Sequence, residues 1–159
     1  MAACEELMAQ GIKITQKDSI AGIRKVVRNT GLTGRWQVLS SSPLTICDTG
    51  HNPGGLKEVV AQIKVTPHKK LHFVIGMVND KDPGKIFKLL PPKATYYFCK
   101  PDIPRGMDAD ELMKKGKTAG LKGRSYSSVK EALTAAKNAA GKDDLVFVGG
   151  STFVVAEVV

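Results

Sequence analysis

Short apolar runs alternate with helical patterns over most of this chain, and this alternation constrains the fold more than any other feature. Apolar runs occur at residues 36–39, 44–47, 71–75, 94–98 and 145–148. Between them, apolar residues recur at three- and four-residue spacings, as they do on one face of a helix. This order predicts an α/β fold with a mostly parallel sheet of about six strands flanked by helices.

Local signals mark where several of the predicted helices begin. Asp108-x-x-Glu111 and Ser128-x-x-Glu131 both have the pattern of a capping box, which places a helix start after Asp108 and after Ser128. A short helix is also expected around residues 86–90. The run at residues 145–148 is apolar enough to be covered on both faces of a sheet.

The first 33 residues have a different pattern from the rest of the chain. Their apolar residues suit two short amphipathic helices, which Gly11 separates and Gly31 ends. We therefore expect an N-terminal helical segment at residues 1–33, followed by a compact unit at residues 34–159.

Composition sets broad limits on location and cofactors. No apolar run approaches the roughly 18 residues of a membrane span, and the N-terminus lacks the apolar core of a signal peptide. A cytoplasmic protein with no membrane partner is expected. The three cysteines, Cys4, Cys47 and Cys99, are far apart and have no paired spacing, which predicts buried free thiols and no metal site.

The chain is strongly basic, with 24 Lys and Arg residues against 15 Asp and Glu residues and a formal net charge of +9. Such a charge attracts polyanions, including nucleotides, polycarboxylates and nucleic acid. The basic residues are spread along the chain and few aromatic residues alternate with them. This distribution is unlike a stacking surface for single-stranded nucleic acid, so no nucleic-acid partner is expected.

The polar segment after residues 44–47 is the strongest local signal for a site. In open parallel sheets, ligands bind beyond the carboxyl ends of the strands. Asn52 and Pro53 suit the N-cap and the first position of a helix and need no functional explanation. Asp48 and His51 are not explained in this way. A carboxylate there accepts hydrogen bonds from ribose hydroxyls, and an imidazole donates to a substrate oxygen.

Three further loops follow apolar runs. Gly149-Gly150-Ser151-Thr152 allows close backbone approach to a carboxylate or phosphate, although a plain turn with a capping serine explains it equally well. The loop at residues 76–83 carries Lys81 and Asp82, and its charge pattern is also typical of a solvated loop. The prolines at residues 101–105 favour an extended loop that aims Arg105 inward.

Several familiar motifs are excluded. Gly116-Lys117-Thr118 is no phosphate loop, because Glu111 stands where that motif requires glycine and because the segment falls late in a predicted helix. The sequence contains no G-x-G-x-x-G, H-E-x-x-H or G-x-S-x-G. Independent nucleotide-binding, zinc-protease and hydrolase functions therefore have no support.

Taken in order, these segments resemble the C-terminal domain of the folylpolyglutamate synthase/dihydrofolate synthase family, within the Mur ligase superfamily. The matching segments are Gly34-Arg35, Asp48-x-x-His51-Asn52-Pro53, Gly76-Met77, Asp80-Lys81-Asp82, Pro101-Asp102-x-Pro104-Arg105 and Gly150-Ser151. The likeness covers essentially the whole chain. Residues 1–33 resemble the end of the family's central ATPase domain with its linker helices, and residues 34–159 resemble its Rossmann-like C-terminal domain. Asp48-Thr49-Gly50-His51 departs from the Asp-Gly-Ala-His associated with many members but keeps the spacing.

The resemblance implies an ATP-dependent acid–amino-acid ligase, which adds L-glutamate to dihydropteroate or folylpolyglutamate through an acyl phosphate. A P-loop ATPase domain of the same polypeptide would hold most of the ATP phosphates and Mg²⁺. By position in the family, Arg35 would contact ATP phosphates and Asp48 the nucleotide. His51 and Ser151 would position the glutamate or the acceptor carboxylate. Lys81, Asp82 and Arg105 would lie in the cleft between the domains.

This chain is expected to be inactive alone, because it contains no phosphate loop. Two alternatives stay open. One is a free-standing basic module that binds nucleotides or other polyanions and has no catalytic partner. The other is the C-terminal domain of a different Mur-type ligase, acting on cell-wall precursors or cyanophycin-like polymers, with different residues around Arg35 and Ser151. A phosphate loop encoded in frame upstream of Met1 would favour a ligase over the binding module.

Overall fold

A computed structural model describes residues 2–80 and 82–159 and divides the chain into two compact units, one ending at Thr33 and the other Gly34–Val159. The first unit contains α1 (Ala2–Ala9), α2 (Gln16–Arg24) and α3 (Val26–Thr30). Lys25, with φ −105° and ψ 13°, separates α2 from α3. The second of the two helices predicted in this region is therefore two helices, α2 and α3.

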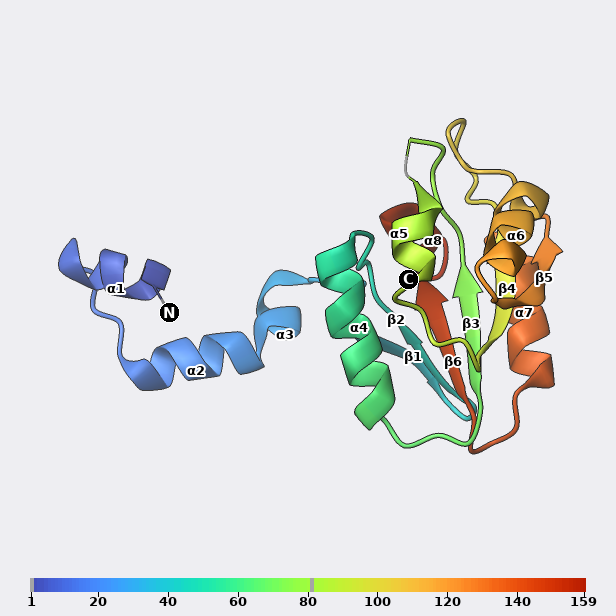
Figure 1. Cartoon of the computed structure of the whole chain (residues 1–159). Coiled ribbons are helices and arrows are strands. Elements are labelled where there is room, and N and C mark those ends of the chain that lie inside the picture. The colour runs from blue at the N-terminus through green and yellow to red at the C-terminus, as the bar shows by residue number, and fades with distance from the viewer. Residues whose placement is uncertain (1, 81) are drawn as a thin grey trace. The chain divides into compact units, whose positions relative to one another are not determined.

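The Gly34–Val159 unit is built on a six-stranded sheet (Figure 1). Its strand order is β1-β2-β6-β3-β4-β5, in which β1 pairs antiparallel with β2 and every other neighbouring pair is parallel. The predicted α/β fold with a mostly parallel sheet of about six strands is confirmed. The strands are β1 (Gln37–Ser41), β2 (Leu44–Cys47), β3 (Leu71–Ile75), β4 (Thr95–Cys99), β5 (Lys122–Tyr126) and β6 (Leu145–Gly149).

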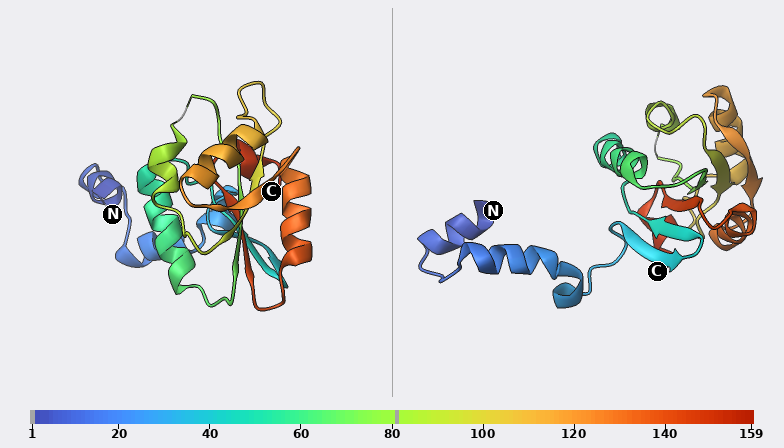
Figure 2. Two further views of the ribbon diagram at one scale, coloured as in Figure 1. Left: turned by 45° about the vertical axis from the view of Figure 1, so that its right-hand side comes forward. Right: turned by 90° about the horizontal axis from the view of Figure 1, so that it is seen from below.

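Helices cover both faces of this sheet (Figure 2). The side chains of α4, α5 and α6 pack with Phe73, Phe98 and Phe147 on one face. Those of α7 and α8 pack with Val74 and Val148 on the other face. Every residue of β3 and β6 is buried, as expected for strands that are covered on both sides. The helices are α4 (Pro53–Val65), α5 (Pro83–Phe87), α6 (Ala109–Thr118), α7 (Val129–Ala139) and α8 (Thr152–Ala156).

The predicted helix starts are confirmed at α6 and α7. The Asp108 carboxylate accepts hydrogen bonds from the backbone N–H groups of Asp110 and Glu111, both at 3.0 Å. The Ser128 hydroxyl accepts from the Glu131 N–H at 3.2 Å. The segment Gly116-Lys117-Thr118 lies at the end of α6, so its backbone is helical and does not form a phosphate loop.

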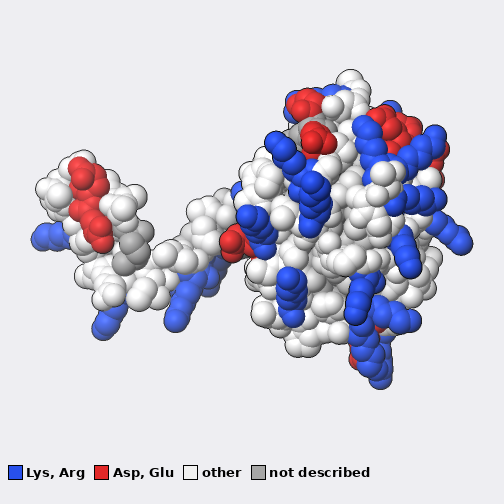
Figure 3. All heavy atoms as spheres, in the orientation of Figure 1, with Lys and Arg blue, Asp and Glu red and all other residues white. Residues whose placement is uncertain are grey.

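Figure 3 shows how the charged residues are distributed on one face of the Gly34–Val159 unit. Lys and Arg side chains are spread over the face shown in Figure 3 instead of gathering in a single patch. Within the described part of the chain, no helix has the length and apolar character needed to cross a bilayer.

Candidate functional site

The carboxyl ends of β2 and β6 form a topological switch point. These two strands are parallel neighbours, with Cys47 opposite Val148. The chain leaves β2 toward α4 on one face of the sheet and leaves β6 toward α8 on the other. Where adjacent connections diverge in this way, ligands bind between them. The candidate site predicted from the sequence is at this position.

Asp48 organises the connection from β2 to α4. Its side chain is buried, with Oδ1 accepting from the Gly50 N–H at 2.7 Å and Oδ2 accepting from the Trp36 N–H at 2.8 Å. A carboxylate that accepts two backbone N–H bonds holds both segments in place. His51 follows in the same connection, and its Nδ1 lies 3.0 Å from the Thr49 carbonyl oxygen. Because a carbonyl can only accept, Nδ1 is the donor, and this bond orients the ring.

The backbone on both sides of Arg35 is hydrogen-bonded to the connection from β2 to α4. On one side, the Gly34 carbonyl accepts from the Thr49 N–H at 2.8 Å. On the other, Trp36 donates its N–H to Asp48. Trp36 has φ 43°, a left-handed conformation that is costly for a residue with a side chain and that its surroundings must enforce. Arg35 itself is exposed. The backbone that carries this exposed cation is thus held beside the turn that carries His51.

Ser151 caps α8 in the connection that follows β6. Its hydroxyl accepts from the Phe153 N–H at 3.2 Å, and the residue is buried. Thr152, the next residue, has its Oγ1 3.5 Å from Nδ1 of His51. At that distance a hydrogen bond is weak, but the contact shows that the two connections meet. The expectation that Ser151 is a capping serine is therefore confirmed, and its functional role stays a prediction.

Gly150 lets the backbone pass closely over the end of β3. It has φ 89°, and a Cβ at this position would lie 2.8 Å from Cγ1 of Ile75 and 3.1 Å from the Gly76 carbonyl oxygen. Only glycine accommodates both this conformation and this contact without strain. The carboxyl ends of β2, β6 and β3 are consequently brought close together.

The remaining candidates have distinct positions. Asp82 caps α5, with its Oδ1 accepting from the Gly84 N–H at 2.9 Å. Arg105 has Nη1 3.3 Å from Oδ2 of Asp80, and its guanidinium carbon lies 5.0 Å from the centroid of the Phe153 ring. Arg105 therefore lies beside α8, on the side of the candidate site, although it remains exposed. Lys81 lies outside the described residues.

The structure thus brings together four of the predicted residues, Arg35, Asp48, His51 and Ser151. They come from the segment before β1 and the connections after β2 and β6, which contact one another. Sequence reasoning missed Trp36 and Thr152. Thr152 had a usable signal, since it directly follows the Gly-Gly-Ser segment. Trp36 had none, because its role depends on the pairing of β1 with β2.

Neither thiol chemistry nor a resident metal is supported at this edge. Burial, followed by the adjacent Asp48 charge, raises the pKa of the Cys47 thiol to about 11. Burial also raises the pKa of Cys99. Both thiols are protonated at neutral pH and are poor nucleophiles. Among residues 2–80 and 82–159, no cluster of three or more His, Cys, Asp or Glu side chains could hold a metal ion.

Comparisons with known proteins identify the family and match the fold. The family described as "Mur ligase, glutamate ligase domain" matches residues 34–152. The dihydrofolate synthase/folylpolyglutamate synthase of Escherichia coli K12 is 32% identical over 158 residues, covering 98% of this chain and 36% of that protein. A probable bifunctional folylpolyglutamate synthase/dihydropteroate synthase of Haloferax volcanii is 35% identical over 136 residues, covering 85% of this chain and 16% of that protein.

Solved structures agree with the sequence relatives. E. coli FolC in complex with DHPP and ADP has a TM-score of 0.81 and 31% identity, covering 98% of this chain and 36% of that one. The bifunctional folylpolyglutamate synthase/dihydrofolate synthase of Yersinia pestis, complexed with AMPPNP and Mn ion, has a TM-score of 0.76 and 29% identity, covering 92% and 34%. This chain therefore spans about a third of the length of these two structures.

Proposed function

This chain belongs to the Mur ligases, in which it is a glutamate ligase domain, and we propose that it serves an ATP-dependent ligase that adds L-glutamate to dihydropteroate or folylpolyglutamate. The supporting observation is that the family match over residues 34–152 includes Arg35, Asp48, His51 and Ser151, and that all four lie at the switch point between β2 and β6. In this proposal the chain is the C-terminal domain, and the switch point faces the nucleotide and the glutamate.

Arg35 is the proposed contact to the ATP phosphates. Its guanidinium is exposed, and the backbone on both sides of it is attached to the turn after β2. A guanidinium carried on a backbone anchored in this way stabilises negative charge on a transferring phosphoryl group. Asp48 is proposed to act on the nucleotide side, and its bond to the Trp36 N–H makes it also the residue that positions Arg35.

His51 and Ser151 are proposed to position the glutamate or the acceptor carboxylate. The reaction would proceed through an acyl phosphate, which the glutamate amino group attacks as phosphate departs. Oriented donors near the developing negative charge favour such a step. The His51 ring is oriented by its bond to Thr49, and Ser151 shapes the adjoining turn as the cap of α8. Asp82, Arg105 and Lys81 stay in the proposal as cleft residues.

A second domain of the same polypeptide is the proposed partner. The helices of the N-terminal unit contain no buried residue, and several of their apolar side chains are exposed, among them Leu7, Met8, Ile20, Ile23 and Val27. Apolar helix faces of this kind are typical of surfaces that another domain covers. We propose that this partner is a P-loop ATPase domain and that it supplies most ligands of the phosphates and of Mg²⁺. The whole enzyme is proposed to be cytoplasmic.

The test is ADP release with ATP, Mg²⁺, L-glutamate and dihydropteroate. The chain alone is expected to release no ADP above a His51→Ala control, because no phosphate loop is present in it. Joined to the part of the E. coli relative outside the matched segment, it should release ADP only when glutamate is present. His51→Ala should lower that rate by about tenfold or more, because the acceptor or the amine is then misplaced.

Three outcomes would count against the proposal. Steady ADP release by the chain alone, at a rate that His51→Ala reduces, would show that it needs no ATPase partner. If the joined protein folds but releases ADP at the same rate with and without glutamate, the alternative of a free-standing module for nucleotides or polyanions is favoured. Glutamate-dependent release with cell-wall precursors as acceptor, and none with dihydropteroate, would favour a different Mur-type ligase.

A further inference from the structure

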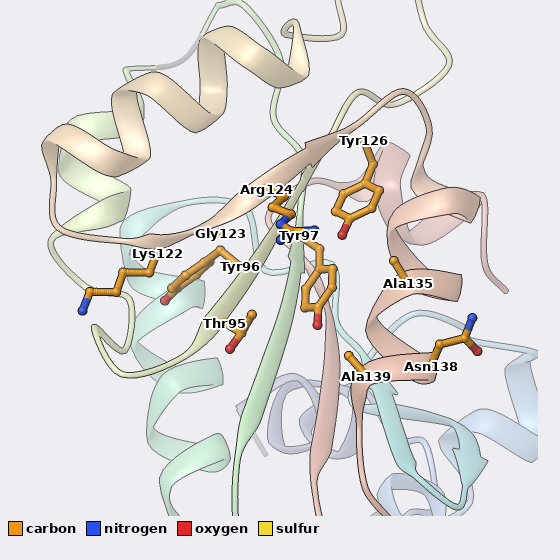
Figure 4. A pocket seen from close by; sticks show the side chains of 10 residues that line it. All are labelled: Thr95, Tyr96, Tyr97, Lys122, Gly123, Arg124, Tyr126, Ala135, Asn138 and Ala139. Carbon is orange, nitrogen blue, oxygen red and sulfur yellow. The ribbon is translucent and has the colours of Figure 1, made fainter.

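A hollow of about 680 Å³ lies between the edge strand β5, its neighbour β4 and the helix α7. This volume falls within the range of small-molecule sites. The hollow is separated from the candidate site by β3, since the strand order runs β2-β6-β3-β4-β5. Figure 4 shows the ten residues that line it: Thr95, Tyr96, Tyr97, Lys122, Gly123, Arg124, Tyr126, Ala135, Asn138 and Ala139. The hollow is called the β5 pocket below.

Small side chains on α7 account for the space. Ala135 and Ala139 face β4 and β5 at positions where larger residues would fill the gap (Figure 4). Besides Tyr96 and Gly123, the sheet side of the pocket is lined by alternate residues of the two strands, which project to one face of a sheet. Lys122, Arg124 and Tyr126 are three such residues of β5. The edge strand thus places two cations and one phenol in a row.

The charged residues that line the pocket are all cations. Lys122 and Arg124 are both exposed cations, and no Asp or Glu is among the ten lining residues. The nearby acid Glu131 lines an adjoining hollow of about 480 Å³, and its carboxylate accepts from the Ser127 hydroxyl at 2.6 Å. Two cations without a lining acid favour an anionic ligand, and an arginine suits a carboxylate or phosphate especially well.

Two aromatic rings form the apolar part of the pocket. The rings of Tyr97 and Tyr126 are stacked, with centroids 5.7 Å apart and an interplanar angle of 26°. Tyr97 is buried, whereas Tyr126 is half-buried and its ring points toward Tyr97 (Figure 4). Burial, countered in part by Arg124, raises the pKa of Tyr97, so its phenol is neutral at physiological pH. A neutral ring face of this kind stacks on planar ligands.

A chain of buried polar side chains holds the Tyr97 ring in position. Its hydroxyl lies 2.9 Å from Nδ1 of His72, and Nε2 of His72 lies 3.5 Å from Oδ2 of Asp144. His72 and Asp144 are both more than nine-tenths buried, with 5% and 8% exposure. Asp144 is in turn bound by the N–H groups of Lys70 and Gly141 at 3.0 and 2.8 Å. The ring is therefore fixed before any ligand arrives, which lowers the entropy cost of binding.

We propose that the β5 pocket binds a small planar aromatic anion, whose ring lies against Tyr126 and Tyr97 and whose anionic group pairs with Arg124. This function is separate from ligation at the carboxyl edge and does not depend on it. The site is placed on the face that α7 covers, at the end of the sheet farthest from β1.

The test uses 1-naphthoate as the probe and neutral 1-naphthamide as its matched control, followed by backbone amide shifts of the ¹⁵N-labelled chain. Naphthoate is expected to shift the amides of β5 and of residues 135–139, with saturation below about 1 mM. Naphthamide should bind at least about tenfold more weakly, because it cannot form the charge-assisted bond to Arg124.

Variants of the chain distinguish binding in the pocket from a general attraction of the anion to a basic protein. Arg124→Gln should weaken naphthoate binding by about tenfold or more, and Ala135→Phe, which fills the hollow, should abolish it. Arg28→Gln removes an exposed arginine of the N-terminal unit and should leave binding unchanged. Unaltered naphthoate binding in a folded Arg124→Gln chain would overturn the proposal. Equal affinity for naphthoate and naphthamide, shifts that avoid β5, or no shifts up to about 10 mM would overturn it too.

Discussion

Asp48→Ala is expected to lower the free energy of unfolding of the Gly34–Val159 unit by about 3 to 5 kcal/mol. Alanine would leave the Trp36 and Gly50 N–H groups without their acceptor, and both bonds are charge-assisted. The thermal midpoint should fall by roughly 10 °C or more. Urea denaturation followed by far-UV circular dichroism measures the loss.

Two control variants sharpen this prediction. Asp48→Asn keeps one acceptor oxygen, so its loss should be smaller, at about 1 to 3 kcal/mol. Glu58→Ala removes an exposed carboxylate from α4 and should change stability by less than about 0.5 kcal/mol. Amide hydrogen exchange should accelerate at Trp36 and Gly50 in Asp48→Ala. If Asp48→Ala and Glu58→Ala unfold at the same urea concentration, Asp48 does not hold this turn together.

Gly150→Ala is expected to destabilise the same unit by about 2 to 5 kcal/mol. The new methyl group must accept a left-handed backbone at φ 89° and would lie 2.8 Å from Cγ1 of Ile75. The connection from β6 to α8 would have to move away from β3, taking Ser151 with it. The fluorescence of Trp36, the single tryptophan, reports the unfolding transition in urea.

Gly120→Ala is the matched control for that substitution. Gly120 has φ 85°, close to the value at Gly150, but a Cβ there would meet no atom within 4 Å. Its loss should be only the cost of the left-handed conformation, about 1 to 2 kcal/mol. The difference between the two variants then measures the contact with Ile75. Equal losses would mean that close packing over β3 contributes nothing.

Burial decides which strands the sequence could predict. β3 and β6 are buried at all five positions, so their sequences are continuous apolar runs and were located correctly. β5 was not located, because Lys122–Tyr126 reads Lys-Gly-Arg-Ser-Tyr and contains no buried residue. It is an edge strand that pairs only with β4, and its backbone hydrogen bonds do not depend on apolar side chains. The β5 pocket could not be anticipated for the same reason.

The position of the candidate site was more predictable than its internal contacts. Ligands generally bind at the carboxyl ends of parallel strands, and Asp48, His51 and Ser151 follow directly after two such ends in the sequence. The bond from the Trp36 N–H to Asp48 joins residues twelve apart and depends on the antiparallel register of Gln37 with Cys47. No local pattern reveals such a contact, so the attachment of Arg35 to this turn emerged only from the fold.

The most direct measurement of the proposed function is a titration of the ¹⁵N-labelled chain with ADP, followed residue by residue. If the switch point faces the nucleotide, shifts should concentrate at residues 34–36, 48–52 and 150–152, and Arg35→Gln should reduce them. Shifts confined to residues 122–126 would place the nucleotide in the β5 pocket instead. That result, or the absence of shifts at the ends of β2 and β6 up to about 10 mM ADP, would contradict a nucleotide-facing edge at Arg35 and Asp48.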